Sequence, residues 1–153
     1  MAGAIKMSDK NYGSAWSVDF ELGHELVDAQ HRRLFELINQ LLKACTDGYD
    51  TKVLKVSIDY LVNYTVQHFR DEEALLLEVS FHGYERHKQL HEGFKVSIAE
   101  IVQKFDINDS TTELSKNLNR IFVRWLINHI QREDRKIIEH IRFLERTASY
   151  LRL

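Results

Sequence analysis

The sequence predicts an all-α protein: an up-down-up-down four-helix bundle with an N-terminal arm and a short C-terminal helix. Its 153 residues include no proline, which permits long uninterrupted helices. Apolar residues recur three and four positions apart, the period of one helix face. The intervening segments are short, as between antiparallel neighbours in a bundle. We expect one domain over residues 1–153, with the arm at 1–23, the bundle at 24–136 and the tail helix at 137–153.

The first half of the chain contains the arm and two long helices. The arm has no long periodicity, and its aromatic residues Trp16 and Phe20 are expected to pack on the bundle. The helices are expected at about residues 28–45 and 51–79, separated by a turn in which Gly48 is a helix-stop residue. Their apolar stripes include Leu34, Ile38, Leu41 and Leu42 in the first helix, and Leu54, Ile58, Leu61, Leu75 and Val79 in the second.

The second half repeats this organisation. The third helix is expected at about residues 84–105, after the break "SFHG". The fourth follows Ser110, which with Glu113 has the pattern of a capping box. A tail helix is expected from about Ile137. The apolar positions are Phe94, Ile98, Ile101 and Phe105 in the third helix, Leu114, Leu118, Ile121 and Trp125 in the fourth, and Ile141, Leu144, Ala148 and Leu151 in the tail.

Composition excludes several classes of function. The 21 basic and 23 acidic side chains are interspersed and give a net charge of −2, so no basic patch favours a nucleic-acid partner. No apolar stretch has the length of a transmembrane helix or the character of a signal peptide. The single cysteine, Cys45, rules out a disulfide framework. We therefore expect a cytoplasmic protein with no membrane partner.

Polar side chains fall on the stripes that should face the bundle interior. One histidine on such a stripe is more often a hydrogen-bonded core residue than a ligand. Five without partners would cost about 1–3 kcal/mol each, much of a typical stability of about 5–15 kcal/mol. A bound metal would satisfy them, because neutral imidazole is a strong ligand for divalent ions. The polar residues on these stripes are His31, His68, Glu72, His87, His91 and His129.

The number of potential ligands favours two metal ions. Five histidines with two carboxylates exceed the roughly six positions of one octahedral ion, and a carboxylate can bridge two ions. Nitrogen and oxygen ligands fit iron, and fit zinc, manganese or copper less distinctively, so spacing leaves the metal open. The segment "HKQLH", residues 87–91, has the spacing of a zinc-protease helix, but Lys88 stands where that enzyme needs glutamate.

Four segments resemble the hemerythrins, and among these the single-domain bacterial members. They are "QHRRLFELIN" (30–39), "HFRDEE" (68–73), "HKQLH" (87–91) and "WLINHIQRED" (125–134), within a resemblance that covers about residues 15–136. The resemblance implies two iron ions per chain, bridged by an oxo or hydroxo group, with dioxygen as ligand. The implied metal ligands are His31, His68, Glu72, His87, His91, His129 and Asp134.

The resemblance also implies a role for each group. His87, His91 and His129 would bind one iron, while His31 and His68 would bind the other and leave it an open position. Glu72 and Asp134 would bridge the two irons. An apolar oxygen pocket would be lined by Leu34, Phe69, Trp125 and Ile130. The neighbouring acids are expected to be solvated: Asp71, Glu73 and Glu133.

One implied ligand disagrees with helical periodicity. On an ideal helix, four residues beyond His129 lead to Glu133, about 40° away, whereas five residues lead to Asp134, about 140° away. Spacing alone favours Glu133, but the family pattern favours Asp134. If Asp134 is the ligand, the fourth helix should widen near residues 130–134, as a π-bulge would allow.

The function that the resemblance implies is reversible dioxygen binding, for transport, storage or delivery, without enzymatic turnover. One alternative is an oxygen or redox sensor or interaction module, with the tail helix as the surface for a protein partner or for self-association. A di-iron peroxidase or nitric-oxide-handling enzyme is a further alternative. It is less favoured because few anionic ligands are present to support high-valent iron.

Overall fold

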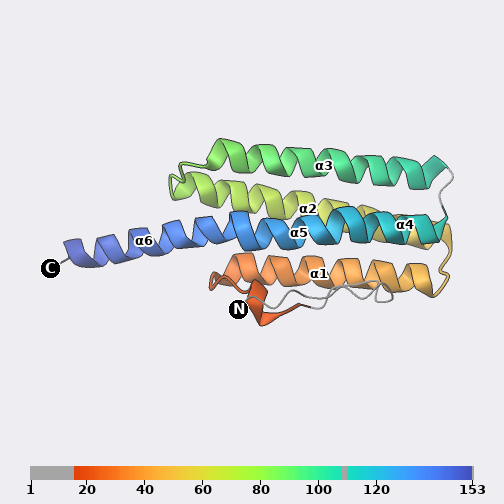
Figure 1. The fold of residues 1–153 in the computed structure, drawn as a ribbon, viewed down its shortest axis with the longest axis horizontal. Coiled ribbons are helices and arrows are strands. Elements are labelled where there is room, and N and C mark those ends of the chain that lie inside the picture. Colours follow the sequence, from red (N-terminus) through yellow and green to blue (C-terminus); the bar gives the residue numbers. More distant parts are fainter. Residues whose placement is uncertain (1–15, 108–109, 153) are drawn as a thin grey trace.

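The fold is a bundle of long helices, seen here in a computed structural model that describes residues 16–107 and 110–152. A short 3-10 helix at Val18–Phe20 precedes the helices α1 (Glu25–Thr46), α2 (Thr51–Glu78) and α3 (Tyr84–Ile107). The fourth member of the bundle comprises α4 (Thr111–Asn117), α5 (Arg124–His129) and α6 (Arg135–Leu151), joined by π-helical segments at Leu118–Val123 and Ile130–Asp134. The predicted all-α bundle is confirmed (Figure 1). No described helix is both long and apolar enough to cross a membrane.

The start of α1 differs from the prediction for a local reason. The helix begins at Glu25, three residues early, because the Nδ1 atom of His24 accepts a hydrogen bond from the backbone N–H of Val27 (3.4 Å). Asp28 lies inside the first turn, where its carboxylate accepts the backbone N–H groups of Leu22 (2.9 Å) and Gly23 (3.0 Å). Asp28 therefore attaches the arm to α1.

The predicted tail helix continues the fourth helix without a break. Residues at both ends of the second π-helical segment keep helical backbone angles, so Asp134 is followed directly by α6. Figure 1 shows α6 extending beyond the end of the bundle. Arg142 ties the start of this extension to the arm, because its guanidinium donates to the carbonyl of Leu22 (2.7 Å). The side chains of α5 and α6 therefore lie on one continuous helix.

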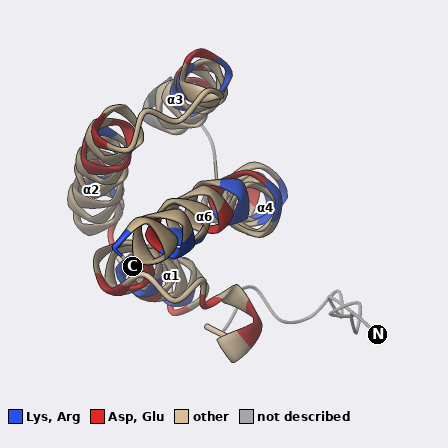
Figure 2. Cartoon of the chain, turned by 90° about the vertical axis from the view of Figure 1, so that its left-hand side faces the viewer, with Lys and Arg blue, Asp and Glu red and all other residues tan. Residues whose placement is uncertain are grey.

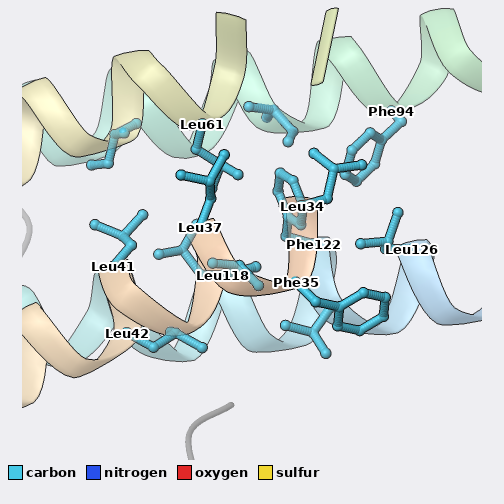
Figure 3. Packing of buried hydrophobic residues seen from close by; sticks show 14 of the residues in the cluster. Leu34, Phe35, Leu37, Leu41, Leu42, Leu61, Phe94, Leu118, Phe122 and Leu126 are labelled. Atoms are coloured by element: carbon cyan, nitrogen blue, oxygen red, sulfur yellow. The ribbon is translucent and has the colours of Figure 1, made fainter. Parts of the chain in front are cut away.

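A continuous apolar core fills the space between the helices, and the arm closes one side of it. Figure 3 shows leucines and phenylalanines from several helices converging there, among them Leu41, Leu42 and Phe122. On the arm, Phe20 stacks on Phe35 of α1 with 5.3 Å between ring centroids. Trp16 packs edge-on against Phe35 at 5.6 Å. The two arm aromatics therefore pack on the bundle as predicted.

We expect burial of this core to account for the stability of the bundle. Substitution of one buried and one exposed leucine tests this. Leu42 is 0% exposed in α1, whereas Leu77 is 59% exposed in α2. We expect Leu42→Ala to lower the free energy of unfolding by about 2–5 kcal/mol, because it removes buried methyl groups and leaves a cavity. Leu77→Ala should cost less than about 1 kcal/mol. Urea unfolding measures both, and equal losses would contradict this description of the core.

Candidate metal centre

The seven side chains implied by the sequence lie together in the bundle interior. His31 comes from α1, His68 and Glu72 from α2, and His87 and His91 from α3. The continuous fourth helix, α4 to α6, supplies His129 and Asp134. Each of the seven is at most 5% exposed. Because every member of the bundle contributes, the cluster exists only when all the helices are packed.

Glu72 lies at the middle of the cluster and faces histidines on two sides. Its Oε1 atom is 2.7 Å from Nε2 of His87 and 3.3 Å from Nε2 of His91. Its Oε2 atom is 3.3 Å from Nε2 of His68 and 3.8 Å from Nε2 of His31. The two oxygens of one carboxylate therefore face different groups of imidazoles.

Asp134 has the same two-sided arrangement. Its Oδ1 atom is 3.0 Å from Nε2 of His129 and 3.3 Å from Nε2 of His87, and its Oδ2 atom is 3.0 Å from Nε2 of His31. Two sets of mutually close ligand atoms result, and both sets include Glu72 and Asp134. One set adds His87, His91 and His129, and the other adds His31 and His68.

The hydrogen bonding of the cluster fits metal ions. Among the described residues, several fully buried atoms make no well-formed hydrogen bond, even where an imidazole and a carboxylate lie 3.0 Å apart: both ring nitrogens of His31, Oε2 of Glu72 and both carboxylate oxygens of Asp134. A buried polar group left in this state costs about 1–3 kcal/mol. Imidazole nitrogens and carboxylate oxygens that converge from several helices are the ligands that divalent transition metals prefer. The donor set therefore suits a metal centre.

The local form of the fourth rod explains why Asp134 reaches the cluster. Residues Ile130–Asp134 form a π-helical segment, which confirms the predicted widening. In such a turn the hydrogen bonds run from residue i to i+5, so a residue five positions after His129 returns to the same face. Glu133 instead points toward the surface and pairs with Lys136 (3.2 Å) and Arg86 (3.3 Å). The structure thus brings Asp134, rather than Glu133, into the cluster.

Residues outside the seven orient the imidazoles, and sequence patterns missed them. Nδ1 of His68 lies 2.7 Å from Oε1 of Gln30, whose amide nitrogen donates to Asp71 (2.7 Å). Nδ1 of His91 lies 2.9 Å from Oε1 of Glu73. Each acceptor places the proton on Nδ1 and leaves Nε2 free to face the cluster.

Two of these acids differ from expectation. Asp71 and Glu73 are half-buried members of this network rather than solvated neighbours. Neither residue lies on the apolar stripe of α2, so periodicity does not predict its contact with the cluster. The one feature of the sequence that points to each is its position next to Glu72.

Of the four residues predicted to line an oxygen pocket, two contact the cluster directly and two are buried in the core. Phe69 stacks on His91 with 3.8 Å between ring centroids, and Trp125 stacks on His129 with 4.3 Å. Leu34 and Ile130 are fully buried, and Figure 3 shows Leu34 pointing into the core. Both aromatic rings therefore contact the three-histidine set. The role of the four residues as a pocket stays a prediction.

The close packing of imidazoles and carboxylates shifts their pKa values strongly. Burial alone lowers the pKa of His31 and His129, but the carboxylates of Asp134 and Glu72 outweigh it and raise these values to about 9 and about 10. Burial raises the pKa of Glu72, but the surrounding histidines hold it well below its ordinary value. The pKa of His68 is lowered, chiefly by burial. A metal ion must therefore displace protons from the cluster.

Comparison with known proteins gives a consistent result. Residues 22–141 match the family described as "Hemerythrin HHE cation binding domain". A bacteriohemerythrin of Stenotrophomonas maltophilia is 34% identical, over 83% of this chain and 80% of its own length. One from Clostridium acetobutylicum is 31% identical over 81% of this chain and 98% of its own length. A myohemerythrin of Riftia pachyptila is 28% identical over 79% and 88%.

The contact between Gln30 and His68 yields a test of the ligand arrangement. We expect Gln30→Ala to weaken the affinity for Fe²⁺ at least about tenfold, because the imidazole loses the group that fixes its proton and orientation. Gln40→Ala, an exposed position on the same helix, is the matched control and should leave the affinity unchanged. Anaerobic titration with a competing chelator measures both. Equal affinities for the two variants would contradict the orienting role of Gln30.

The raised histidine pKa values predict how the metal-free protein responds to pH. His31 and His129 titrate at about 9 and about 10 when folded, against about 6.5 when unfolded. The stability they contribute is complete below about pH 6.5 and is lost as pH rises through the folded values. Urea unfolding of the chelator-treated protein should show this loss. The dependence of unfolding free energy on pH should be flatter in His129→Gln. It should be unchanged in His140→Gln, a substitution outside the cluster. A flat profile in the unsubstituted protein would refute the assignment.

Proposed function

Because the chain belongs to the hemerythrin family, we propose that it binds dioxygen reversibly at two iron ions held by the seven-residue cluster. The observation that carries this proposal is the pair of overlapping ligand sets, which share Glu72 and Asp134. Two carboxylates with one oxygen toward each set are suited to bridging two ions. The proposed centre thus contains one iron in each set, with an oxo or hydroxo group as a further bridge.

The two sets differ in a way that suits ligand binding at one of them. One set offers five residues and the other four, because the second contains only His31 and His68 besides the shared carboxylates. The iron in the four-residue set would therefore have the open position. The seven residues would hold two ferrous ions, which when bound would supply the electrons that dioxygen accepts.

The chain itself contributes an apolar, anchored environment. We assign the walls of the oxygen pocket to Leu34, Phe69, Trp125 and Ile130, which exclude water beside the cluster. The orienting contacts from Gln30 and Glu73 fix the imidazoles, so the ligand geometry changes little when dioxygen enters or leaves. Such an environment favours release of the bound molecule over its reduction, which supports binding without catalysis.

A second candidate function is oxygen or redox sensing. The observation in its favour is that α6 continues the rod carrying His129 and Asp134 and extends past the bundle. A change at the cluster would then be transmitted to a surface that a partner can reach. Comparing the proteolysis of α6 in the oxidised and reduced protein tests this: equal cleavage rates would exclude it.

The experiment that tests the main proposal is iron analysis combined with absorption spectroscopy. We expect two iron ions per chain, one for each ligand set. The anaerobically reduced protein should be colourless, gain a charge-transfer band on exposure to dioxygen and lose it when dioxygen is removed. Two irons that oxidise at once without a reversible band would instead favour the sensor or an enzyme. One ion, or another metal, would overturn the ligand assignment.

The assigned pocket wall gives a further prediction. Leu34→Asn introduces an amide that attracts water to the apolar side of the cluster, and we expect the oxygenated form to oxidise about tenfold faster, a barrier change of about 1.4 kcal/mol. Leu34→Met keeps the wall apolar and is the matched control, with a rate close to that of the unsubstituted protein. The decay of the charge-transfer band measures the rates. Equal rates would remove Leu34 from the pocket.

A further inference from the structure

The described chain has two apolar surfaces that its own core does not use. One is the exposed face of α6, and the other is a groove between α2 and α3. We propose that the tail helix α6 of one copy docks in the α2–α3 groove of a second copy. The groove adjoins the aromatic wall of the cluster, since its lining residue Phe94 stacks on Trp125 (3.9 Å), but it contains none of the seven ligand residues and the proposal does not depend on what the cluster binds.

The tail helix presents large apolar side chains that the described chain leaves partly or largely exposed. Leu144 is 39% exposed and Leu151 82%, and on the adjoining side Phe143 is 58% and Tyr150 77% exposed. Figure 1 shows this part of α6 beyond the end of the bundle. An exposed apolar face of this kind on a helix marks an interaction site.

The spacing of this face is that of a helix that packs on other helices. Ile137, Ile141, Leu144, Ala148 and Leu151 follow one another at steps of four, three, four and three. The first two already pack in the bundle, since Ile137 is buried and Ile141 lies against the core. The seam therefore continues beyond the bundle in a form that fits a surface made of helices.

The groove between α2 and α3 is such a surface. It has a volume of about 400 Å³, and its lining is mainly apolar, with Thr65, Phe94 and Ile98 buried at its base. On α2 the lining extends from Asp59 to Val66, seven steps along the helix, or about 10 Å at 1.5 Å per residue. The exposed seam from Leu144 to Leu151 also covers seven steps along its helix. An amphipathic helix in an apolar groove is a common mode of recognition.

Charge favours pairing of a tail with a bundle over pairing of two tails. Residues 135–152 contain five basic and two acidic side chains, a net charge of +3, so with −2 for the whole chain the remainder carries −5. Figure 2 marks basic and acidic positions along the helix that ends in α6. Two tails would repel each other, whereas a tail and a bundle attract. The groove lining itself contains one acidic and one basic side chain, Asp59 and Lys95, so the attraction comes from the charge of the whole bundle.

The contact must be between copies. The groove lining on α2 ends at Val66, twelve residues before the helix ends at Glu78 beside the base of the tail, which is about 18 Å along the axis. The tail extends away from that end (Figure 1). It therefore cannot fold back into the groove of its own chain without breaking the rod that carries Asp134.

Sedimentation velocity of the full, iron-loaded chain over a wide concentration range tests the proposal. We expect reversible self-association, weakened at least about tenfold in dissociation constant by Leu151→Lys in the tail and by Ala99→Lys in the groove. Both positions are exposed, so neither variant should unfold. Leu77→Lys, an exposed leucine outside both surfaces, is the matched control and should associate normally.

Mixing the two variants gives the sharpest result. At concentrations where each variant alone is monomeric, the mixture should form heterodimers, because the intact tail of one meets the intact groove of the other. A chain that stays monomeric throughout would overturn the proposal. Association that is lost in Leu151→Lys but kept in Ala99→Lys would also overturn it, because this result means that two tails pair with each other. Binding of a monomeric chain to phosphatidylglycerol vesicles would overturn it too, because the tail would then dock on a lipid surface. Reversible dioxygen binding, measured in both variants, reports separately on the proposed function.

Discussion

Two buried carboxylates are the constraint on which the rest of the structure depends. Glu72 directs one oxygen toward three histidines and the other toward two. Asp134 directs one oxygen toward two histidines and the other toward one. Such groups are tolerated in an apolar interior only when their partners surround them on every side. The partners come from every long helix, so satisfying two carboxylates fixes how all the helices pack. The apolar core then excludes the water that would otherwise compete for the same atoms.

The residues around the two carboxylates form successive layers, each of which holds the layer inside it in place. Next to the imidazoles lie the groups that fix their protons, Gln30 and Glu73. Beside these, the rings of Phe69 and Trp125 stack on His91 and His129, which holds the rings in place without offering them a competing hydrogen bond. The arm closes the outside through Asp28 and Phe20. Orientation is therefore supplied by polar contacts, and rigidity by aromatic packing.

Much of the cluster could be predicted from the sequence, because the spacing of residues along a helix determines which of them face the bundle interior. A histidine on an apolar stripe must face inward, so the convergence of His31, His68 and His129 follows from spacing. Asp134 is different: an ideal helix points it elsewhere, and only the family resemblance indicated it. Gln30 and Glu73 could not be predicted, because a residue beside a ligand lies off the stripe and its contacts depend on how neighbouring helices pack. The continuity of the tail also depends on packing, since its apolar period alone fits a separate helix equally well.

The π-helical turn at Ile130–Asp134 has a consequence for how this sequence can change. An additional residue in a helix rotates everything after it by about 100°. The turn that carries Asp134 inward therefore also sets the direction in which Ile137, Leu144 and Leu151 point. Loss of one residue there would misdirect both the carboxylate and the exposed face of α6 at once. Insertions and deletions in this stretch should survive only in compensating pairs, so its length should be held more strictly over evolutionary time than most of its residue identities.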